Sequence, residues 1–368
     1  MSIEGIGIIG ATRKSFNIAC ILVEKGFQVR VYDSFKESLA VFMAKIKWRL
    51  ERDGKSDFLS NIDVVQEYSK FRGADLILDF SGKTFEERFL YFSKFLKEVD
   101  SRCIIGINSV FPLITNFERI NILPYERTVG VTVGELFPIS VMEVSKTNYT
   151  ELGVIETFLE FLNRLGIKGV VINDTPGGII ERLYRVYFNS AFDVLYKGKG
   201  FPSYIDESIK SLTNSGYGPF ELLDLRSIDY DYNTSVVISE MIPHKNNLKP
   251  NEIEHKIFQY GQLGKKSSVG IYLYEDGQIV GENPVLPNII QYLGLRQTSK
   301  EEIFSDVMIP LYNEAVEIAK ELMVGEQDIE SITKDIFGFE HGVFGYKQIY
   351  PELFVKKERS EFDNLDVF

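Results

Sequence analysis

The sequence predicts an α/β domain with a doubly wound parallel sheet, followed by two tandem all-helical domains. Through the first half, short apolar runs alternate with helical patterns, as expected for parallel strands joined by crossover helices. After a turn-rich segment at residues 173–178, strand patterns become sparse and helical periodicity dominates. Similar strings then recur within the helical half, which indicates two copies of one module.

The period of the apolar residues predicts each element of the first half. Residues 3–9 form a nearly continuous apolar run, which favours a strand buried on both faces, and residues 27–32 alternate as a second strand. Helical periodicity covers residues 35–52, and an amphipathic helix is expected over residues 152–165. Further strands are expected at residues 76–80, 103–108, 129–133 and 169–172.

The helical half carries a weak internal repeat. Its strings Phe188–Ala191 and Gly218–Phe220 return, at the same separation from each other, as Tyr312–Ala315 and Gly342–Phe344. Between them, Ile205–Ile209 resembles Asp328–Ile332 after a shift of one residue. We therefore predict an α/β domain at residues 1–175, helical domains at 176–275 and 276–355, and a charged tail at 356–368.

Composition excludes several classes of function. The 368 residues include 41 basic and 53 acidic side chains, a formal net charge of −12, and no basic block that would suit a nucleic acid. No apolar run reaches the roughly 18 residues needed to span a bilayer, and the first residues lack the features of a signal peptide. Two cysteines are too few for a disulfide framework or a cysteine metal site. We expect a cytoplasmic protein with no metal, no nucleic-acid partner and no membrane association.

A series of motifs in fixed order runs from the end of the first half into the second. It begins with Glu143–Thr147, continues through Val171–Gly177 and Glu181–Leu183, and ends with the string GPFELLD at Gly218–Asp224. In order and spacing these motifs resemble the 3-hydroxyacyl-CoA dehydrogenase family, and the resemblance covers almost the whole chain. It implies a Rossmann-type domain that binds NAD, helical domains that complete an acyl-CoA cleft, and a place in fatty acid metabolism. The family reaction is the NAD-dependent oxidation of 3-hydroxyacyl-CoA to 3-oxoacyl-CoA.

The family's catalytic base has no counterpart at the matching position. That base is a histidine in an HFFNP motif, and the corresponding stretch here, Val133–Pro138, contains none. Glu135 is the nearest candidate by position. The three histidines of the chain, His244, His255 and His341, all lie in the helical half.

The other catalytic positions are partly altered. Glu143 corresponds to the carboxylate that orients the base, although a glutamate there can also form a structural ion pair. The family's serine that contacts the substrate oxygen falls on Val110, and a slip of one residue would restore Ser109. The family's active-site asparagine corresponds to Glu181, next to Arg182.

The dinucleotide fingerprint is also incomplete. Gly10 retains the residue of the tight turn, but Thr12 and Ser15 occupy the other two glycine positions. A side chain at Thr12 should crowd a bound diphosphate, which weakens the case for ordinary NAD binding. Arg13 and Lys14 could hold a phosphate by charge or simply form a solvated basic loop.

Two further residues bear on the cofactor. Asp33, at the end of the second strand, is placed either to bind the ribose 2′-OH of NAD or to cap the following helix. Lys83 takes the position of the family's acidic residue near the nicotinamide ribose. The segment over residues 35–71, which in the family covers the CoA, is abbreviated here.

These observations leave three hypotheses. The first is a divergent family member without normal dehydrogenase activity, a pseudoenzyme that binds a nucleotide, an acyl-CoA or a protein partner. The second is an active oxidoreductase with a substitute base. The third is a carboxylate-based reaction on an acyl-CoA, in which Glu135, Glu143 and Glu181 converge, unless each of them pairs with a neighbour such as Arg182. Because the second helical copy could bury the apolar face of the first, we predict a monomer or a weak homodimer.

Overall fold

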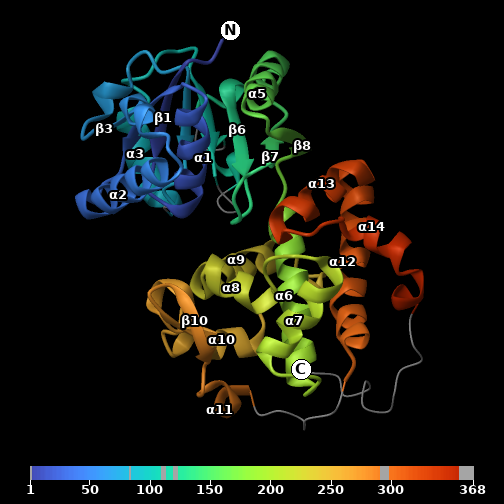
Figure 1. Ribbon diagram of the computed structural model, residues 1–368. Helices are drawn as coiled ribbons and strands as arrows, with labels where there is room; N and C mark the ends of the chain where they lie inside the picture. Colours follow the sequence, from blue (N-terminus) through green and yellow to red (C-terminus); the bar gives the residue numbers. More distant parts are fainter. Residues whose placement is uncertain (1, 83, 109–112, 119–122, 291–297, 356–368) are drawn as a thin grey trace.

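The protein folds into an α/β domain and a helical body that lie one above the other (Figure 1). The computed structural model describes residues 2–82, 84–108, 113–118, 123–290 and 298–355. The predicted fold class is confirmed: a doubly wound, mostly parallel sheet precedes a long helical region. None of the helices in the described part of the chain is long and apolar enough to cross a membrane.

The α/β domain is built on an eight-stranded sheet in the order β3-β2-β1-β4-β5-β6-β7-β8. Only the β6–β7 pair is antiparallel. The direction of the strand order changes between β1 and β4, and a crevice outside the carboxyl ends of the strands is expected at such a point. The strands are β1 (Gly5–Ile9), β2 (Gln28–Tyr32), β3 (Ile62–Val64), β4 (Leu76–Asp79), β5 (Ile104–Ile107), β6 (Thr128–Thr132), β7 (Val141–Lys146) and β8 (Lys168–Asn173).

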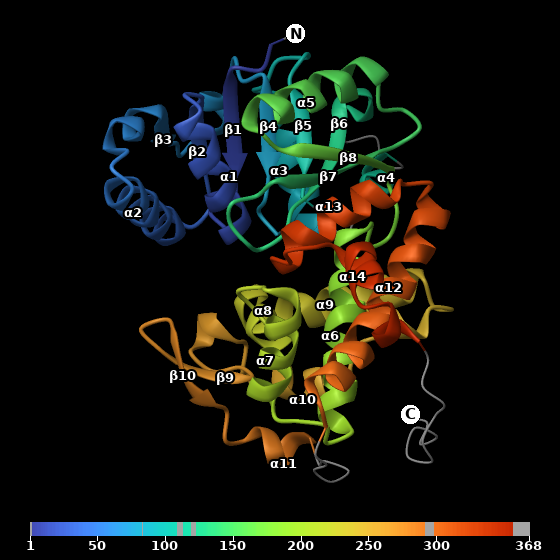
Figure 2. The same ribbon diagram turned by 45° about the vertical axis from the view of Figure 1, so that its right-hand side comes forward.

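Helices cover both faces of this sheet (Figure 2). Residues of α1, α2 and α5 pack on one face, and residues of α3 and α4 pack on the other. The helices are α1 (Arg13–Glu24), α2 (Lys36–Arg52), α3 (Phe85–Phe95), α4 (Ile114–Glu118) and α5 (Leu152–Leu165). The predicted strands all form, to within two residues at their ends, and α5 spans the predicted residues 152–165.

Two strands of the sheet are absent from the predicted set. The strand β3 has only three residues, which is too short to show a period. In β7 the buried Glu143 interrupts the apolar run, so the pattern fits neither an alternating strand nor a wholly apolar one.

The helical body contains two similar three-helix units, α6–α8 and α12–α14. In the first, the α7 carboxylate of Asp206 accepts hydrogen bonds from the first N–H groups of α8, at Phe220 (2.8 Å) and Glu221 (3.0 Å). In the second, the α13 carboxylate of Glu330 does the same at Phe344 and Gly345 of α14 (2.9 and 3.0 Å). The helices are α6 (Ile180–Tyr196), α7 (Pro202–Thr213), α8 (Pro219–Arg226), α9 (Ile228–Met241), α10 (Glu252–Gln259), α11 (Leu286–Ile290), α12 (Lys300–Leu322), α13 (Glu326–Phe337) and α14 (Val343–Ile349).

A small hairpin, which the sequence reading does not predict, is added to the first unit. Strands β9 (Tyr272–Glu275) and β10 (Gln278–Glu282) are joined at Asp276 and Gly277, whose φ angles are +48° and +76°. An Asp-Gly pair between two short strands is a strong hairpin signal, although helical periodicity dominates this half of the sequence. The hairpin crosses the predicted domain boundary at residue 275, and the three domain boundaries stay predictions.

The helix-starting glycines give a stability prediction. A Cβ atom at Gly218 would lie 2.3–2.5 Å from side-chain and backbone atoms of Asp206, and one at Gly342 would lie 2.3–2.6 Å from atoms of Glu330. We expect Gly218→Ala and Gly342→Ala each to destabilise the protein by about 2 kcal/mol, because the overlap forces backbone shifts. Gly325 also begins a helix, at an ordinary φ of −66°, but a Cβ there meets only Asp328, at 3.7 Å.

Urea unfolding monitored by circular dichroism measures these effects. Gly325→Ala is the matched control and should lower the midpoint much less than the other two substitutions. Equal effects at all three glycines would show that the loss of helix capping, and not the close approach of the carboxylate, sets the cost.

Candidate active site

The loop between β1 and α1 is stabilised by its own side chains. Gly10 makes the tight turn with a φ of +97°, and a Cβ there would lie 2.5 Å from the Cα of Ser81. Thr12 and Ser15, at the two missing glycine positions, form a reciprocal cap: the Ser15 N–H donates to Thr12 Oγ1 (3.3 Å), and the Thr12 N–H donates to Ser15 Oγ (2.9 Å). Two backbone donors at the start of α1 are therefore already paired.

Asp33 holds the same loop from the end of β2. Its Oδ2 accepts a hydrogen bond from the Ala11 N–H (2.7 Å), and its Oδ1 accepts one from the Phe35 N–H (2.9 Å). A cavity of about 430 Å³ lies beside it and is lined by residues that include Tyr32 and Tyr68. The carboxylate thus organises the loop, and its contact with a ribose stays a prediction.

A second cavity, of about 500 Å³, lies between α1 and α2. Its charged lining consists of two cationic residues, Arg13 and Lys45, and one acidic residue, Glu37. The aromatic rings of Phe16 and Phe42 also line it and meet edge to face at 6.1 Å. Such a surface suits a ligand that carries both anionic and apolar groups.

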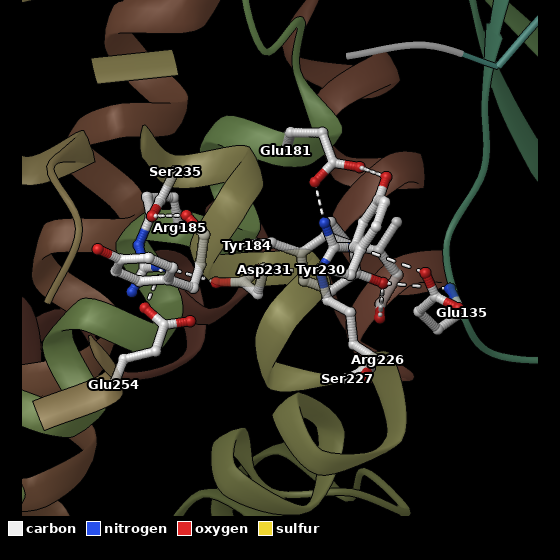
Figure 3. Close-up of polar contacts among 12 residues, drawn as sticks. Glu135, Glu181, Tyr184, Arg185, Arg226, Ser227, Tyr230, Asp231, Ser235 and Glu254 are labelled. Carbon is white, nitrogen blue, oxygen red and sulfur yellow. Dashed lines mark hydrogen bonds and ion pairs between the residues drawn. The ribbon is translucent and has the colours of Figure 1, made fainter. Parts of the chain in front are cut away.

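Glu135 and Glu181, two of the residues predicted from the sequence, belong to a buried charged cluster between the two domains (Figure 3). Lys14 Nζ of α1 lies 3.5 Å from Glu135 Oε1 and 3.6 Å from Glu181 Oε1. Arg226, at the end of α8, pairs with both of the same carboxylates and lies 3.5 Å from Glu135 Oε1. All four residues are at least nine-tenths buried. We call these four residues the cleft cluster.

Two tyrosines enclose the cleft cluster. Tyr230 of α9 donates to Glu181 Oε1 (3.3 Å) and accepts from Lys14 (3.4 Å), while its ring lies 4.8 Å from the Arg226 guanidinium. The Tyr184 hydroxyl accepts a hydrogen bond from the Glu135 N–H (3.3 Å) and donates to the Ile336 carbonyl of α13 (3.1 Å). The second helical unit thereby helps to hold the loop that carries Glu135.

The charges continue from the cleft cluster into the helical body (Figure 3). Arg226 Nε donates to Asp231 (2.9 Å), and Arg185 donates to Asp231 (2.6 Å) and to Glu254 (2.7 Å). Burial and the nearby Asp231 raise the pKa of Glu254 above its usual value. The network therefore favours a protonated Glu254, which reduces its excess of negative charge.

Glu143 does not join the ion pairs of the cleft cluster. Its Oε2 accepts hydrogen bonds from the N–H groups of Ile179 (2.8 Å) and Ile180 (3.0 Å) at the start of α6. Burial raises its pKa to about 7, although these two hydrogen bonds oppose the shift. A Cβ at Gly178 would lie 2.1 Å from Glu143 Oε1, so this glycine makes room for the carboxylate.

The structure brings together only some of the residues singled out in the sequence. Glu135 and Glu181 meet at shared cations, but these are Lys14 and Arg226, whereas Arg182 pairs with Glu314 (2.6 Å) and Glu321 (2.7 Å) of α12. Ser109 and Lys83 lie outside the described residues. Arg226 and Tyr230 are absent from the predicted site, and their sequence signal is a position two and six residues beyond the end of the GPFELLD string.

No histidine takes part in the hydrogen bonds and ion pairs of the cleft cluster that involve described residues. His255 stacks on Tyr232 of α9 at 4.9 Å, and His341 packs against Tyr346 at 5.8 Å. Within the same residues, no group of three or more His, Cys, Asp or Glu side chains is arranged to hold a metal ion.

Comparisons with known proteins agree with this architecture. The 3-hydroxyacyl-CoA dehydrogenase NAD binding domain matches residues 5–175, and the C-terminal domain of the same family matches residues 177–274. The 3-hydroxybutyryl-CoA dehydrogenase of Bradyrhizobium diazoefficiens is 25% identical over 288 residues, which are 76% of this chain and 98% of that protein.

Two solved structures extend the likeness to the second helical unit. The 3-hydroxybutyryl-CoA dehydrogenase from Escherichia coli K12 superposes with a TM-score of 0.78 at 18% identity, over 96% of this chain and 93% of that one. The dehydrogenase part of multifunctional enzyme 1 from C. elegans gives a TM-score of 0.64 at 19% identity, over 96% and 85%. At these identities the likeness shows a shared fold. Taken with the two family matches, it shows that the chain belongs to the 3-hydroxyacyl-CoA dehydrogenase family, whose N-terminal domain binds NAD and whose substrates are acyl-CoA thioesters.

Proposed function

We propose that this chain is a divergent family member that binds an acyl-CoA or a related ligand without normal dehydrogenase activity. The observation that carries the proposal is the state of Glu135, the residue nearest the position of the family's catalytic histidine. Glu135 is 4% exposed, and its carboxylate is engaged by both Lys14 and Arg226. A carboxylate in that setting is not presented to a substrate hydroxyl, and general-base catalysis requires hydrogen-bond contact with the proton to be removed.

The nucleotide loop supports weak NAD binding at most. A dinucleotide diphosphate is normally held by free backbone N–H groups at the start of the first helix. Here the N–H groups of Ala11, Thr12 and Ser15 are already bonded to side chains of the protein itself. NAD remains the cofactor that the family implies, but these residues do not fit its diphosphate in the conformation described.

For the ligand we propose an acyl-CoA or a related small molecule in the cavity between α1 and α2. The cations Arg13 and Lys45 suit the phosphates of CoA, and the neighbouring aromatic rings suit its apolar parts. Since α12 of the second helical unit packs along α6 of the first, we propose a monomer or a weak homodimer. The two buried cysteines are free thiols, which is consistent with a cytoplasmic protein.

The test is an assay for NADH formation with NAD and 3-hydroxybutyryl-CoA. Loss of the general base alone lowers a rate about 10²–10⁴-fold, so we expect turnover far below about 1 s⁻¹, the low end for typical enzymes. The Bradyrhizobium diazoefficiens relative serves as the positive control. Turnover of this chain above about 1 s⁻¹ would refute the proposal.

One observation favours a second candidate function, an oxidoreductase with a substitute base. Burial raises the pKa of Glu143 to about 7, which is the range that suits a general base. If the wild-type chain is active, Glu143→Gln should then abolish turnover, and unchanged turnover would remove Glu143 from the mechanism. The third hypothesis, a carboxylate-based reaction, gains no support because Glu135 and Glu181 are both occupied by cations.

A further inference from the structure

Two buried ion pairs of the cleft cluster cross from the α/β domain to the helical body. In one, the cation comes from the α/β domain: Lys14 of α1 pairs with Glu181 of α6. In the other, the anion comes from the α/β domain: Glu135, between β6 and β7, pairs with Arg226 of α8. The cation comes from a different domain in each pair, so each domain supplies one cation and one anion to the contact.

The first turn of α1 makes further contacts across the same boundary. Arg13 donates to the Leu225 carbonyl near the end of α8 (3.5 Å), and Lys14 donates to the hydroxyl of Tyr230 (3.4 Å). In a dinucleotide-binding domain this turn faces the cofactor diphosphate. In this chain both basic side chains of the turn contact the helical body, and Arg13 also lines the cavity between α1 and α2.

We infer that the pairs Lys14–Glu181 and Arg226–Glu135 form an ionic clasp that holds the two domains together and that a ligand entering between them must open. The inference rests on the proposed function, because the ligand is the acyl-CoA proposed there. Its CoA part would occupy the cavity between α1 and α2, and its acyl end would reach the neighbouring cleft cluster, since Asn17 lines that cavity and donates to the Glu135 carbonyl (3.5 Å). The side chains of the four clasp residues are between 0% and 9% exposed, and their charges balance. A ligand oxygen therefore reaches Glu135 or Glu181 only by displacing Lys14 or Arg226.

Opening the clasp is unfavourable for a physical reason. Separating the domains breaks both crossing pairs together, so each of the four charges loses one partner and keeps the one in its own domain, Lys14 with Glu135 and Arg226 with Glu181. The loss of a partner from a buried charge is costly. The ligand's apparent affinity is reduced by the fraction of molecules in the open state, so a variant that opens more easily should bind more tightly.

The double variant Lys14→Met/Glu135→Gln tests the clasp. It removes one cation and one anion, both supplied by the α/β domain, so the charge of the cleft cluster does not change. Glu181 keeps Arg226, and Arg226 also keeps Asp231, so no charge of the helical body is left unpaired. Small-angle X-ray scattering should show a larger radius of gyration, and calorimetry should show acetoacetyl-CoA binding at least about tenfold more tightly than to wild type.

The matched control is Lys168→Met/Asp328→Asn, which removes an exposed ion pair (2.7 Å) between β8 and α13. It should leave the scattering profile and the affinity unchanged, because exposed pairs contribute little. If the double variant does not fold, each single variant removes one crossing pair and should give part of both effects. Unchanged scattering or unchanged affinity in a folded clasp variant overturns the inference. Neither result depends on the turnover assay that tests the proposed function.

Discussion

Replacing Arg226 by Met should lower the free energy of unfolding by about 3–5 kcal/mol, the usual cost of removing one partner from a buried ion pair. Arg226 is the only residue in the described part of the chain that contacts Glu135, Glu181 and Asp231 together. After the substitution, Glu135 and Glu181 share Lys14 alone, and Asp231 keeps Arg185. Methionine retains much of the side-chain volume, so the loss would be mainly electrostatic.

Urea unfolding of Arg226→Met and of a matched exposed variant separates this effect from a general effect of removing arginine. Arg72 is 73% exposed in its side chain and pairs with Glu98 (3.2 Å), and Arg72→Met should leave the urea midpoint unchanged. Adding Glu181→Gln to Arg226→Met should recover part of the lost stability, because one uncompensated carboxylate is removed with the cation. If Arg226→Met unfolds at the wild-type midpoint, the cleft cluster contributes nothing to stability.

The sequence predicts the three glutamates of the candidate site better than it predicts the contacts of Lys14. Glu135, Glu143 and Glu181 could be found because family motifs of fixed spacing surround them. For Lys14 the sequence predicts contact with a phosphate or with solvent, because a basic residue is expected in a nucleotide-binding loop. Its actual partners depend on how the helical body docks onto α1, and no local pattern records that arrangement.

The secondary structure also follows from local sequence patterns, whereas contacts between distant elements do not. The predicted strands and α5 follow from local periodicity, and the repeat of α6–α8 in α12–α14 follows from matching strings. The shifted match between Ile205–Ile209 and Asp328–Ile332 pairs Glu207 with Glu330 and is not the structural one. The register of the other repeated strings aligns Asp206 with Glu330, and these two carboxylates bond the next helix in the same way. Arg226 and Tyr230 lie next to a recognised motif, but only the tertiary structure shows that they face the cleft.

Replacing Glu143 by Gln should remove a pH dependence of stability. Burial raises the folded-state pKa of Glu143 from 4.5 to about 7, so between these values the folded protein holds a proton that the unfolded chain releases. The contribution of protonated Glu143 to the free energy of unfolding is therefore complete below about pH 4.5. It is lost as the pH rises through about 7. By pH 8 the loss is about 3 kcal/mol, from 1.36 kcal/mol per pKa unit.

The variant should consequently be more stable than wild type at pH 8, by up to about 3 kcal/mol, and nearly equal to it at pH 4. The amide oxygen of glutamine can still accept the N–H groups of Ile179 and Ile180, which keeps the start of α6 in place. Chemical unfolding of both proteins from pH 4 to pH 8 gives the difference directly, and other titrating groups cancel because both proteins carry them. Glu160→Gln, at an exposed position of α5, is the control and should follow the wild-type profile. A stability difference between Glu143→Gln and wild type that does not change with pH would mean that Glu143 is ionised throughout this range, and that its two backbone hydrogen bonds outweigh its burial.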